Sequence, residues 1–309
     1  MTIPSPQNRN RPYPRRTLLY TPADARERME KVPKYDADGV VFDLDDSVPD
    51  EHLPEARQNI REVTRDVDFD SMEVIVKLDA YETNLWMDDL EVALESEVDA
   101  VAMPKIEHSK EVQTVVDLME RYAGPTPELI LYIETPEAVI RLNDIAETAR
   151  QLDPVTGMIC SWGDDITRNM GTMPPRFGDT SVGQHLGDWL SNYVALAATG
   201  AGLDPISYPH VEIHNHETLR TRAEYARDSG YVGQLALHPT QLETINDVFT
   251  PDEDDVARAL RLAEEFDSME SDSVLIDDIF IDQAMAVHYR QFIARYEEIT
   301  GKDAASLIE

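Results

Sequence analysis

The chain has 309 residues, of which 42% are hydrophobic, 61 are acidic and 27 are basic, so its net charge is −34. This length and apolar content are enough to bury a sizeable core, which excludes a disordered chain. The charge excludes nucleic-acid binding, which needs a basic face. It indicates a halophilic cytoplasm, because about 1 M salt shortens the Debye length to about 3 Å and screens the repulsion.

The chain carries no sign of export or membrane insertion. Its one cysteine, Cys160, cannot form an intrachain disulfide, which fits a reducing cytoplasmic compartment. Residues 1–14 are rich in proline and lack the apolar core of a signal peptide, so we expect a flexible arm there. No apolar stretch approaches the ~18 residues of a membrane span, so we expect no membrane partner.

Short apolar runs alternate with longer amphipathic stretches along most of the chain. The expected strands are Thr17–Thr21, Gly39–Leu44, Val74–Leu78, Ala100–Lys105, Leu129–Thr135, Gly157–Gly163, Pro205–Tyr208 and Gly233–His238. Helical patterns between them include Ala23–Val32, Pro54–Val63 and Thr218–Ser229. Strands this apolar predict a buried parallel sheet, and eight strand–helix units predict an α/β fold, a TIM (β/α)₈ barrel, over residues 15–250. A doubly wound open sheet remains an alternative, because periodicity does not prove closure.

A helical extension is expected at residues 251–309. Thr250 and Pro251 have the pattern of a helix start, with Thr250 as the N-cap. A polar linker, Ser268–Ser273, then separates this helix from Val274–Asp282 and a last helix. The extension is too small to form an independent domain. Its apolar faces therefore need the barrel or, as we expect, a neighbouring subunit to cover them.

Several polar residues stand where the predicted strands end, and the chemistry of a barrel takes place at that edge. They are Asp43, Asp45, Asp46, Lys77, Asp79, Lys105, Glu134, Asp164, Asp165 and His238. Glu134 and Asp165 end neighbouring strands, so their carboxylates can meet at one Mg²⁺ ion, which favours one or two carboxylates plus water and substrate oxygens. Each could instead cap the helix that follows it.

The basic candidates have two interpretations each. Lys77 and Lys105 could neutralise an anionic substrate or a developing enolate, or could form ion pairs with nearby carboxylates. Arg16, before the first strand, could contact a phosphate or be an ordinary solvated charge. His214 and His216 form an H-x-H pair that lacks a third ligand with zinc-site spacing.

Seven short motifs, in order and spacing, resemble the HpcH/HpaI aldolase/citrate lyase family, and within it the branch of the citrate lyase β-subunit. The motifs are Arg16–Pro22 (R-T-L-L-Y-T-P), Val41–Val48 (V-F-D-L-D-D-S-V), Met103–Ile106 (M-P-K-I), Ile133–Thr135 (I-E-T), Gly163–Ile166 (G-D-D-I), Leu237–Gln241 (L-H-P-T-Q) and Asn246–Pro251 (N-D-V-F-T-P). The resemblance runs from about Arg16 to Asp282.

The resemblance implies a barrel, a homo-oligomer that is a trimer or hexamer, and Mg²⁺. It places the metal ligands on Glu134 and Asp165. It also places a catalytic aspartate, contributed to the neighbouring subunit's site, on Asp277 in Asp277–Asp282. The implied reaction is cleavage of a 3-hydroxyacyl-CoA thioester, such as malyl-, citramalyl- or citryl-CoA, into a 2-oxo acid and acetyl-CoA, or the reverse condensation. Lys77 would stabilise the negative charge that develops on the substrate oxygen. Arg16 and Lys105 would bind the coenzyme A end or organise the site.

Three positions depart from the family pattern. Lys77 stands where the family has arginine, and the change loses the bidentate guanidinium. Asp278 stands where a glycine is expected, and Gln234 where a lysine is common. Two other functions therefore stay open: a CoA-independent HpaI-type aldolase of 4-hydroxy-2-oxo acids, which lacks the extension, and an accessory subunit that needs a carrier-protein partner.

Overall fold

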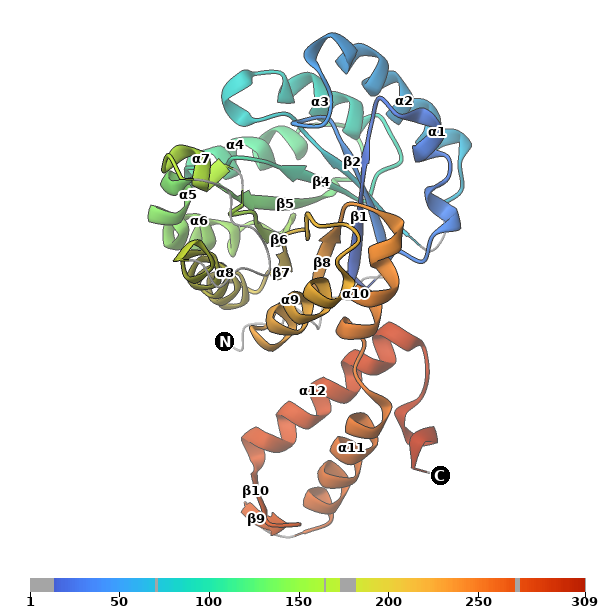
Figure 1. Cartoon of the computed structure of the whole chain (residues 1–309), viewed down its shortest axis with the longest axis vertical. Helices are drawn as coiled ribbons and strands as arrows, with labels where there is room; N and C mark the ends of the chain where they lie inside the picture. The colour runs from blue at the N-terminus through green and yellow to red at the C-terminus, as the bar shows by residue number, and fades with distance from the viewer. Residues whose placement is uncertain (1–13, 70–71, 164, 173–181, 270–272, 309) are drawn as a thin grey trace. The chain divides into compact units, whose positions relative to one another are not determined.

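The computed structural model describes residues 14–69, 72–163, 165–172, 182–269 and 273–308 (Figure 1). The predicted N-terminal arm therefore lies, except for residue 14, outside the described residues, as does Asp164. The chain divides into two compact units between Asp247 and Val248, and each is described by itself. No helix among the described residues is long and apolar enough to cross a membrane.

Eight parallel strands of the first unit close into a barrel in the order β1 to β8. They are β1 (Thr17–Pro22), β2 (Gly39–Asp43), β3 (Glu73–Lys77), β4 (Ala100–Met103), β5 (Glu128–Ile133), β6 (Val155–Cys160), β7 (Asp204–Ser207) and β8 (Gly233–Ala236). The barrel closes where β1 pairs with β8, with Leu18 opposite Leu235. The predicted barrel is thus confirmed, and the open sheet is excluded.

Helices surround the strands of the first unit (Figure 1). They are α1 (Arg26–Met29), α2 (Leu53–Asp66), α3 (Trp86–Leu94), α4 (Ser109–Met119), α5 (Pro136–Ile140), α6 (Leu142–Ala149), α7 (Asp165–Asn169), α8 (Val182–Ala201) and α9 (His216–Asp228), and α10 (Leu242–Phe249) crosses into the second unit. The predicted helix over Ala23–Val32 is wrong in extent. It shrinks to α1 and a separate 3₁₀ turn at Val32–Lys34, because Pro33 lacks the N–H that a continuous helix needs.

One apolar layer fills the barrel interior. Every strand contributes to it, through Leu18, Val41, Ile75, Ala100, Ala102, Ile130, Tyr132, Ile159, Ile206 and Leu235. Because side chains alternate across a strand, residues two positions further along point to the same side. This alternation brings Tyr20, Asp43, Lys77 and Glu134 toward the interior above the apolar layer, at the carboxyl ends of the strands.

The amino end of the barrel is closed by a buried arginine. The Arg15 guanidinium binds both carboxylate oxygens of Glu73, at 2.8 and 2.5 Å, as well as Glu128 at 2.7 Å and Asp204 at 3.3 Å. Burial alone would lower the Arg15 pKa, but these carboxylates raise it overall. Gly233 makes room for this segment, because a Cβ there would lie 1.7 Å from the Arg15 carbonyl oxygen.

The second unit pairs two helices and ends in a hairpin. It contains α11 (Glu253–Ser268), β9 (Ser273–Ile276), β10 (Ile279–Asp282) and α12 (Gln283–Thr300). The predicted cap at Thr250 is wrong, because the Asp252 side chain accepts hydrogen bonds from the N–H groups of Asp254 and Asp255 and the helix begins two residues later than expected. An aspartate satisfies these free N–H groups well and favours the positive end of the helix.

Loss of the Arg15 side chain should unfold the barrel more easily. We expect Arg15→Ala to lower the free energy of unfolding by about 3–5 kcal/mol, because three carboxylates would remain at the amino end without their cation. Urea unfolding followed by tryptophan fluorescence measures this loss. Arg65→Ala is the matched control, because Arg65 is exposed and pairs with its neighbour Asp66. Equal stability of both variants would contradict the structural role of Arg15.

Candidate active site

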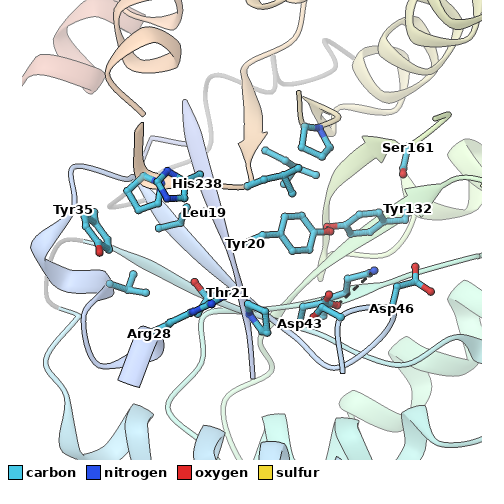
Figure 2. Close-up of a pocket in the computed structure, with 18 of the residues that line it drawn as sticks. Leu19, Tyr20, Thr21, Arg28, Tyr35, Asp43, Asp46, Tyr132, Ser161 and His238 are labelled. Carbon is cyan, nitrogen blue, oxygen red and sulfur yellow. Dashed lines mark hydrogen bonds and ion pairs between the residues drawn. The ribbon is translucent and has the colours of Figure 1, made fainter. Parts of the chain in front are cut away.

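A cavity of about 850 Å³ opens at the carboxyl end of the barrel. Its lining includes the predicted site residues Lys77, Glu134, Asp165 and His238. Its size fits a cofactor or a drug-sized ligand, which pockets of about 300–1,000 Å³ accommodate. Figure 2 shows Arg28 and Tyr35 on one side of the cavity and Asp46, Tyr132 and Ser161 on the other.

Asp45 forms ion pairs with both predicted lysines at the carboxyl end of the barrel. Lys77 Nζ lies 2.8 Å from Asp45 and 3.6 Å from Asp43. Lys105 Nζ donates to both oxygens of Asp45, at 3.1 and 3.0 Å, and lies 3.2 Å from Asp46. Burial opposes the charge of Lys77, yet Tyr20, the aspartates and Glu134 raise its pKa well above the ordinary value, so the ammonium stays charged.

Glu134 and Asp165 line the same cavity from different elements. Glu134 follows β5 and is 2% exposed, and its carboxylate accepts a hydrogen bond of 2.9 Å from the Lys105 backbone N–H. Asp165 is the first residue of α7, five residues beyond the end of β6, and forms an ion pair with Arg168. The structure thus brings the two predicted metal ligands to one cavity.

The electrostatic state of Glu134 favours a cation beside it. Burial raises the Glu134 pKa to about 7, and Asp165 and Asp45 add to the rise, although Lys77 and Lys105 lower it. Burial also raises the Asp165 pKa, with further contributions from Asp46 and Asp45. Burial makes ionisation of both carboxyl groups unfavourable. A divalent ion bound between them would offset this cost, so the two groups are a suitable ligand set for such an ion.

Neither Arg16 nor Asp277 is among the residues that line the cavity. Arg16 precedes β1, at the opposite end of the barrel, and its guanidinium binds Asp38 at 2.7 and 2.9 Å. This position gives no support to the predicted contact with coenzyme A. Asp277 belongs to the second unit, where its carboxylate lies 2.8 Å from Arg261.

The structure explains one departure from the family pattern, the aspartate at position 278, and shows the contact made by another, Gln234. Asp277 and Asp278 form the turn between β9 and β10, with φ angles of 49° and 63°. Aspartate tolerates the left-handed conformation that a two-residue hairpin turn needs, so Asp278 can replace a glycine. The side chain of Gln234, in β8, donates to the Tyr208 carbonyl at 3.1 Å.

The H-x-H pair does not gather a metal set within the part of the chain that the structure describes. No group of three or more histidine, cysteine, aspartate or glutamate side chains there is arranged so that it could hold a metal ion. His214 instead packs against His238, with ring centroids 6.4 Å apart.

Several polar groups of the cavity are not among the residues predicted from the sequence, and they include Tyr20, Tyr132 and Arg28. The sequence pattern places the two tyrosines only within predicted strands. The alternation of β1 and β5 was the available signal, because it places both on the interior side, two positions beyond Leu18 and Ile130. Arg28 has no such signal, because it belongs to the short helix α1, whose extent differs from the predicted one.

Residues 16–239 match the model of the HpcH/HpaI aldolase/citrate lyase family. The chain belongs to this family. The match covers well over half of the chain and confirms the resemblance seen in the motifs. Together with relatives that are named citramalyl-CoA lyase, the family match supports a carbon–carbon lyase.

Curated relatives extend the comparison beyond the barrel. A (3S)-malyl-CoA thioesterase of Cereibacter sphaeroides is 27% identical over 296 residues, which cover 95% of this chain and 98% of that protein. The mitochondrial citramalyl-CoA lyase of Homo sapiens is 24% identical, with 82% of this chain and 76% of that protein covered.

Solved relatives share the fold. The CitE protein of Mycobacterium tuberculosis, in complex with magnesium, acetoacetate and coenzyme A, superposes with a TM-score of 0.75 at 24% identity, covering 93% of this chain and 99% of that chain. The same protein with magnesium and pyruvate gives a TM-score of 0.67 at 25% identity, covering 79% and 93%. Magnesium, the cofactor implied by the motifs, is thus bound in solved members of the family.

The raised Glu134 pKa predicts how stability depends on pH without a metal. The folded state holds this proton up to a pKa of about 7, against an ordinary 4.5, so it binds more protons than the unfolded chain between these values. The free energy of unfolding should therefore fall as pH rises from 4.5 to 7, by up to about 3 kcal/mol. Glu134→Gln should remove this fall and be more stable than wild type at about pH 8.

Urea unfolding in EDTA and about 2 M KCl, across this pH range, measures the effect. Glu147→Gln, on the exposed face of α6, is the matched control and should follow wild type. If the free energy of unfolding fell with pH as steeply in Glu134→Gln as in wild type, the assignment of a buried, poorly compensated charge to Glu134 would be contradicted.

Proposed function

We propose that the chain is a Mg²⁺-dependent lyase for a 3-hydroxyacyl-CoA thioester that carries a carboxylate beside its hydroxyl, such as malyl-CoA or citramalyl-CoA. The products are a 2-oxo acid and acetyl-CoA, and the same site can run the reverse condensation. The observation that carries the proposal is one cavity lined by Glu134, Asp165 and the charged Lys77, with Lys105 paired to the same Asp45 as Lys77. The proposed setting is a salt-rich cytoplasm, which suits the net charge of −34.

Glu134 and Asp165 would hold the ion from the side of β5 and β6. When bound, Mg²⁺ supplies a Lewis acid and a template for the carboxylate and hydroxyl oxygens of the substrate. The raised pKa of Glu134 supports this role, because burial and neighbouring carboxylates leave its negative charge poorly compensated by protein groups.

Lys77 would stabilise the oxygen charge that develops in the reaction. Lys77 is only 4% exposed, and ion pairs with Asp43 and Asp45 fix the position of its ammonium group. A preorganised cation of this kind contributes to catalysis because it needs no reorganisation when charge develops. Lys105, bound to the same Asp45, would keep this arrangement in order rather than meet the substrate.

Bond cleavage would begin when the substrate hydroxyl transfers its proton to a water molecule in the open cavity. The carbon–carbon bond then breaks, and its electron pair moves into the thioester to give the acetyl-CoA enolate. We assign Asp277 of a second copy of the chain as the acid that protonates the enolate carbon, or as the base in the condensation direction. Its carboxylate stands on a tight turn and is exposed, which suits insertion into another subunit's cavity.

The coenzyme A end would lie toward the mouth of the cavity. Arg28 and Lys31 line it there, and both side chains are exposed in a chain with few basic residues. Phosphate groups prefer such cations. Arg28 and Lys31, rather than Arg16, are therefore the residues that we assign to the coenzyme A end.

A thioester panel tests the reaction. Malyl-, methylmalyl-, citramalyl- and citryl-CoA, with the corresponding free acids, are incubated with purified protein, Mg²⁺ and about 2 M KCl, and 2-oxo acid release is measured. We expect turnover of at least one thioester but of no free acid. Glu134→Ala and Asp165→Ala should fall below about 1% of wild type while keeping the fold. Glu147→Ala is the control, and full activity of both site variants would refute the metal assignment.

Subunit complementation tests the role of Asp277. Asp277→Asn and Glu134→Gln are each expected to be inactive, but when unfolded, mixed in equal amounts and refolded together they should recover about a quarter of wild-type activity. A quarter of the mixed sites would combine an intact Glu134 with an intact Asp277 from the neighbour. No recovery above the separately refolded variants would contradict a shared site.

A further inference from the structure

Two tyrosines meet across the axis of the barrel directly beneath the candidate site. Tyr20 comes from β1 and Tyr132 from β5, on opposite sides of the closed sheet, and their hydroxyl groups are hydrogen-bonded to each other. Figure 2 shows the two side chains pointing toward one another, end to end. Both rings pack with the apolar interior layer, and both residues line the cavity. The pair therefore separates the apolar core from the polar cavity.

The pair has one more O–H donor than its own hydrogen bond uses. Two phenol groups bring two O–H donors, and the bond between them uses one. Among the described residues, no other hydrogen bond to either hydroxyl is formed. Phenylalanine would fill the core equally well, so packing alone gives no reason for hydroxyl groups at this depth.

The surroundings indicate what the spare proton meets. Lys77 Nζ lies 5.9 Å from the centre of the Tyr20 ring and 5.4 Å from that of Tyr132. The nearby carboxylates Asp43 and Asp45 are already engaged with this ammonium. A charged ammonium and a spare O–H at the floor of one cavity are two donors directed at an oxygen that the ligand must bring.

We infer that the Tyr20–Tyr132 pair is a substrate-binding element, which donates its spare hydroxyl proton to a carboxylate or carbonyl oxygen at the acyl end of the substrate. The inference rests on the proposed function for the substrate class, a small 2-oxo acid or the acyl group that yields it. The pair sets how deep the acyl end enters, because the two rings close the barrel beneath it. Either tyrosine can supply the proton, since the bond between the hydroxyls can run in both directions.

This shared proton gives the pair a distinctive mutational pattern. With one hydroxyl removed, the remaining tyrosine still has a proton to donate, so Tyr20→Phe and Tyr132→Phe should each weaken ligand binding by less than about threefold. The double variant has no donor, and a hydrogen bond to a charged oxygen is lost. Its affinity should fall by about tenfold or more. A purely structural hydrogen bond would instead be lost completely in each single variant.

Isothermal titration of glyoxylate, pyruvate and oxaloacetate into the full chain, with Mg²⁺ and about 2 M KCl, measures these affinities. Tyr35→Phe is the matched control, because Tyr35 lines the same cavity but is 37% exposed. It should bind like wild type. The thioester assay on the same variants should show the loss in KM more than in kcat.

Three results would overturn the inference. These are a double variant within about twofold of wild type, single effects that multiply to the double effect, or a wild-type protein that binds none of the three oxo acids. Failure of the proposed function looks different. In that case Glu134→Ala would leave turnover unchanged, or no thioester would be cleaved, whereas oxo-acid binding would still depend on the tyrosine pair.

Discussion

The candidate site depends on one electrostatic constraint, the crowding of buried carboxylates at the carboxyl end of the barrel. Asp45 forms ion pairs with the ammonium groups of both Lys77 and Lys105. Glu134 is left buried with a backbone N–H as its closest described partner and a pKa raised to about 7. A divalent ion shared with Asp165 would offset this imbalance, and the proposed chemistry would follow from it.

The two ends of the barrel contrast in this respect. At the amino end, the buried guanidinium of Arg15 is the shared partner of three carboxylates, which belong to Glu73, Glu128 and Asp204. At the carboxyl end, Lys77 and Lys105 share Asp45, and a cavity of about 850 Å³ opens there. The ion pairs of Arg15 therefore hold strands of the fold together, while the charges at the carboxyl end line or adjoin a space that a ligand can enter.

Much of the fold was readable from the sequence, because apolar runs of strand length mark a buried parallel sheet. All eight strands were predicted, and Glu134 and Asp165 were expected together since both follow neighbouring strands. The failures were local. Asp252 competes with Thr250 as a cap, Pro33 divides the first helix, and the hairpin around Asp277 depends on aspartates in a left-handed conformation. The ion-pair partner of Arg16 and the hydrogen bond between Tyr20 and Tyr132 could not be predicted, because they depend on which residues the closed barrel brings together.

The location of the bound ion tests the account most directly. Crystals grown with Mn²⁺ in place of Mg²⁺ would reveal it through an anomalous difference map. We expect one strong peak between the carboxylates of Glu134 and Asp165, at ordinary Mn–O distances of about 2.2 Å. A peak elsewhere, or no peak with the two side chains turned apart, would contradict it.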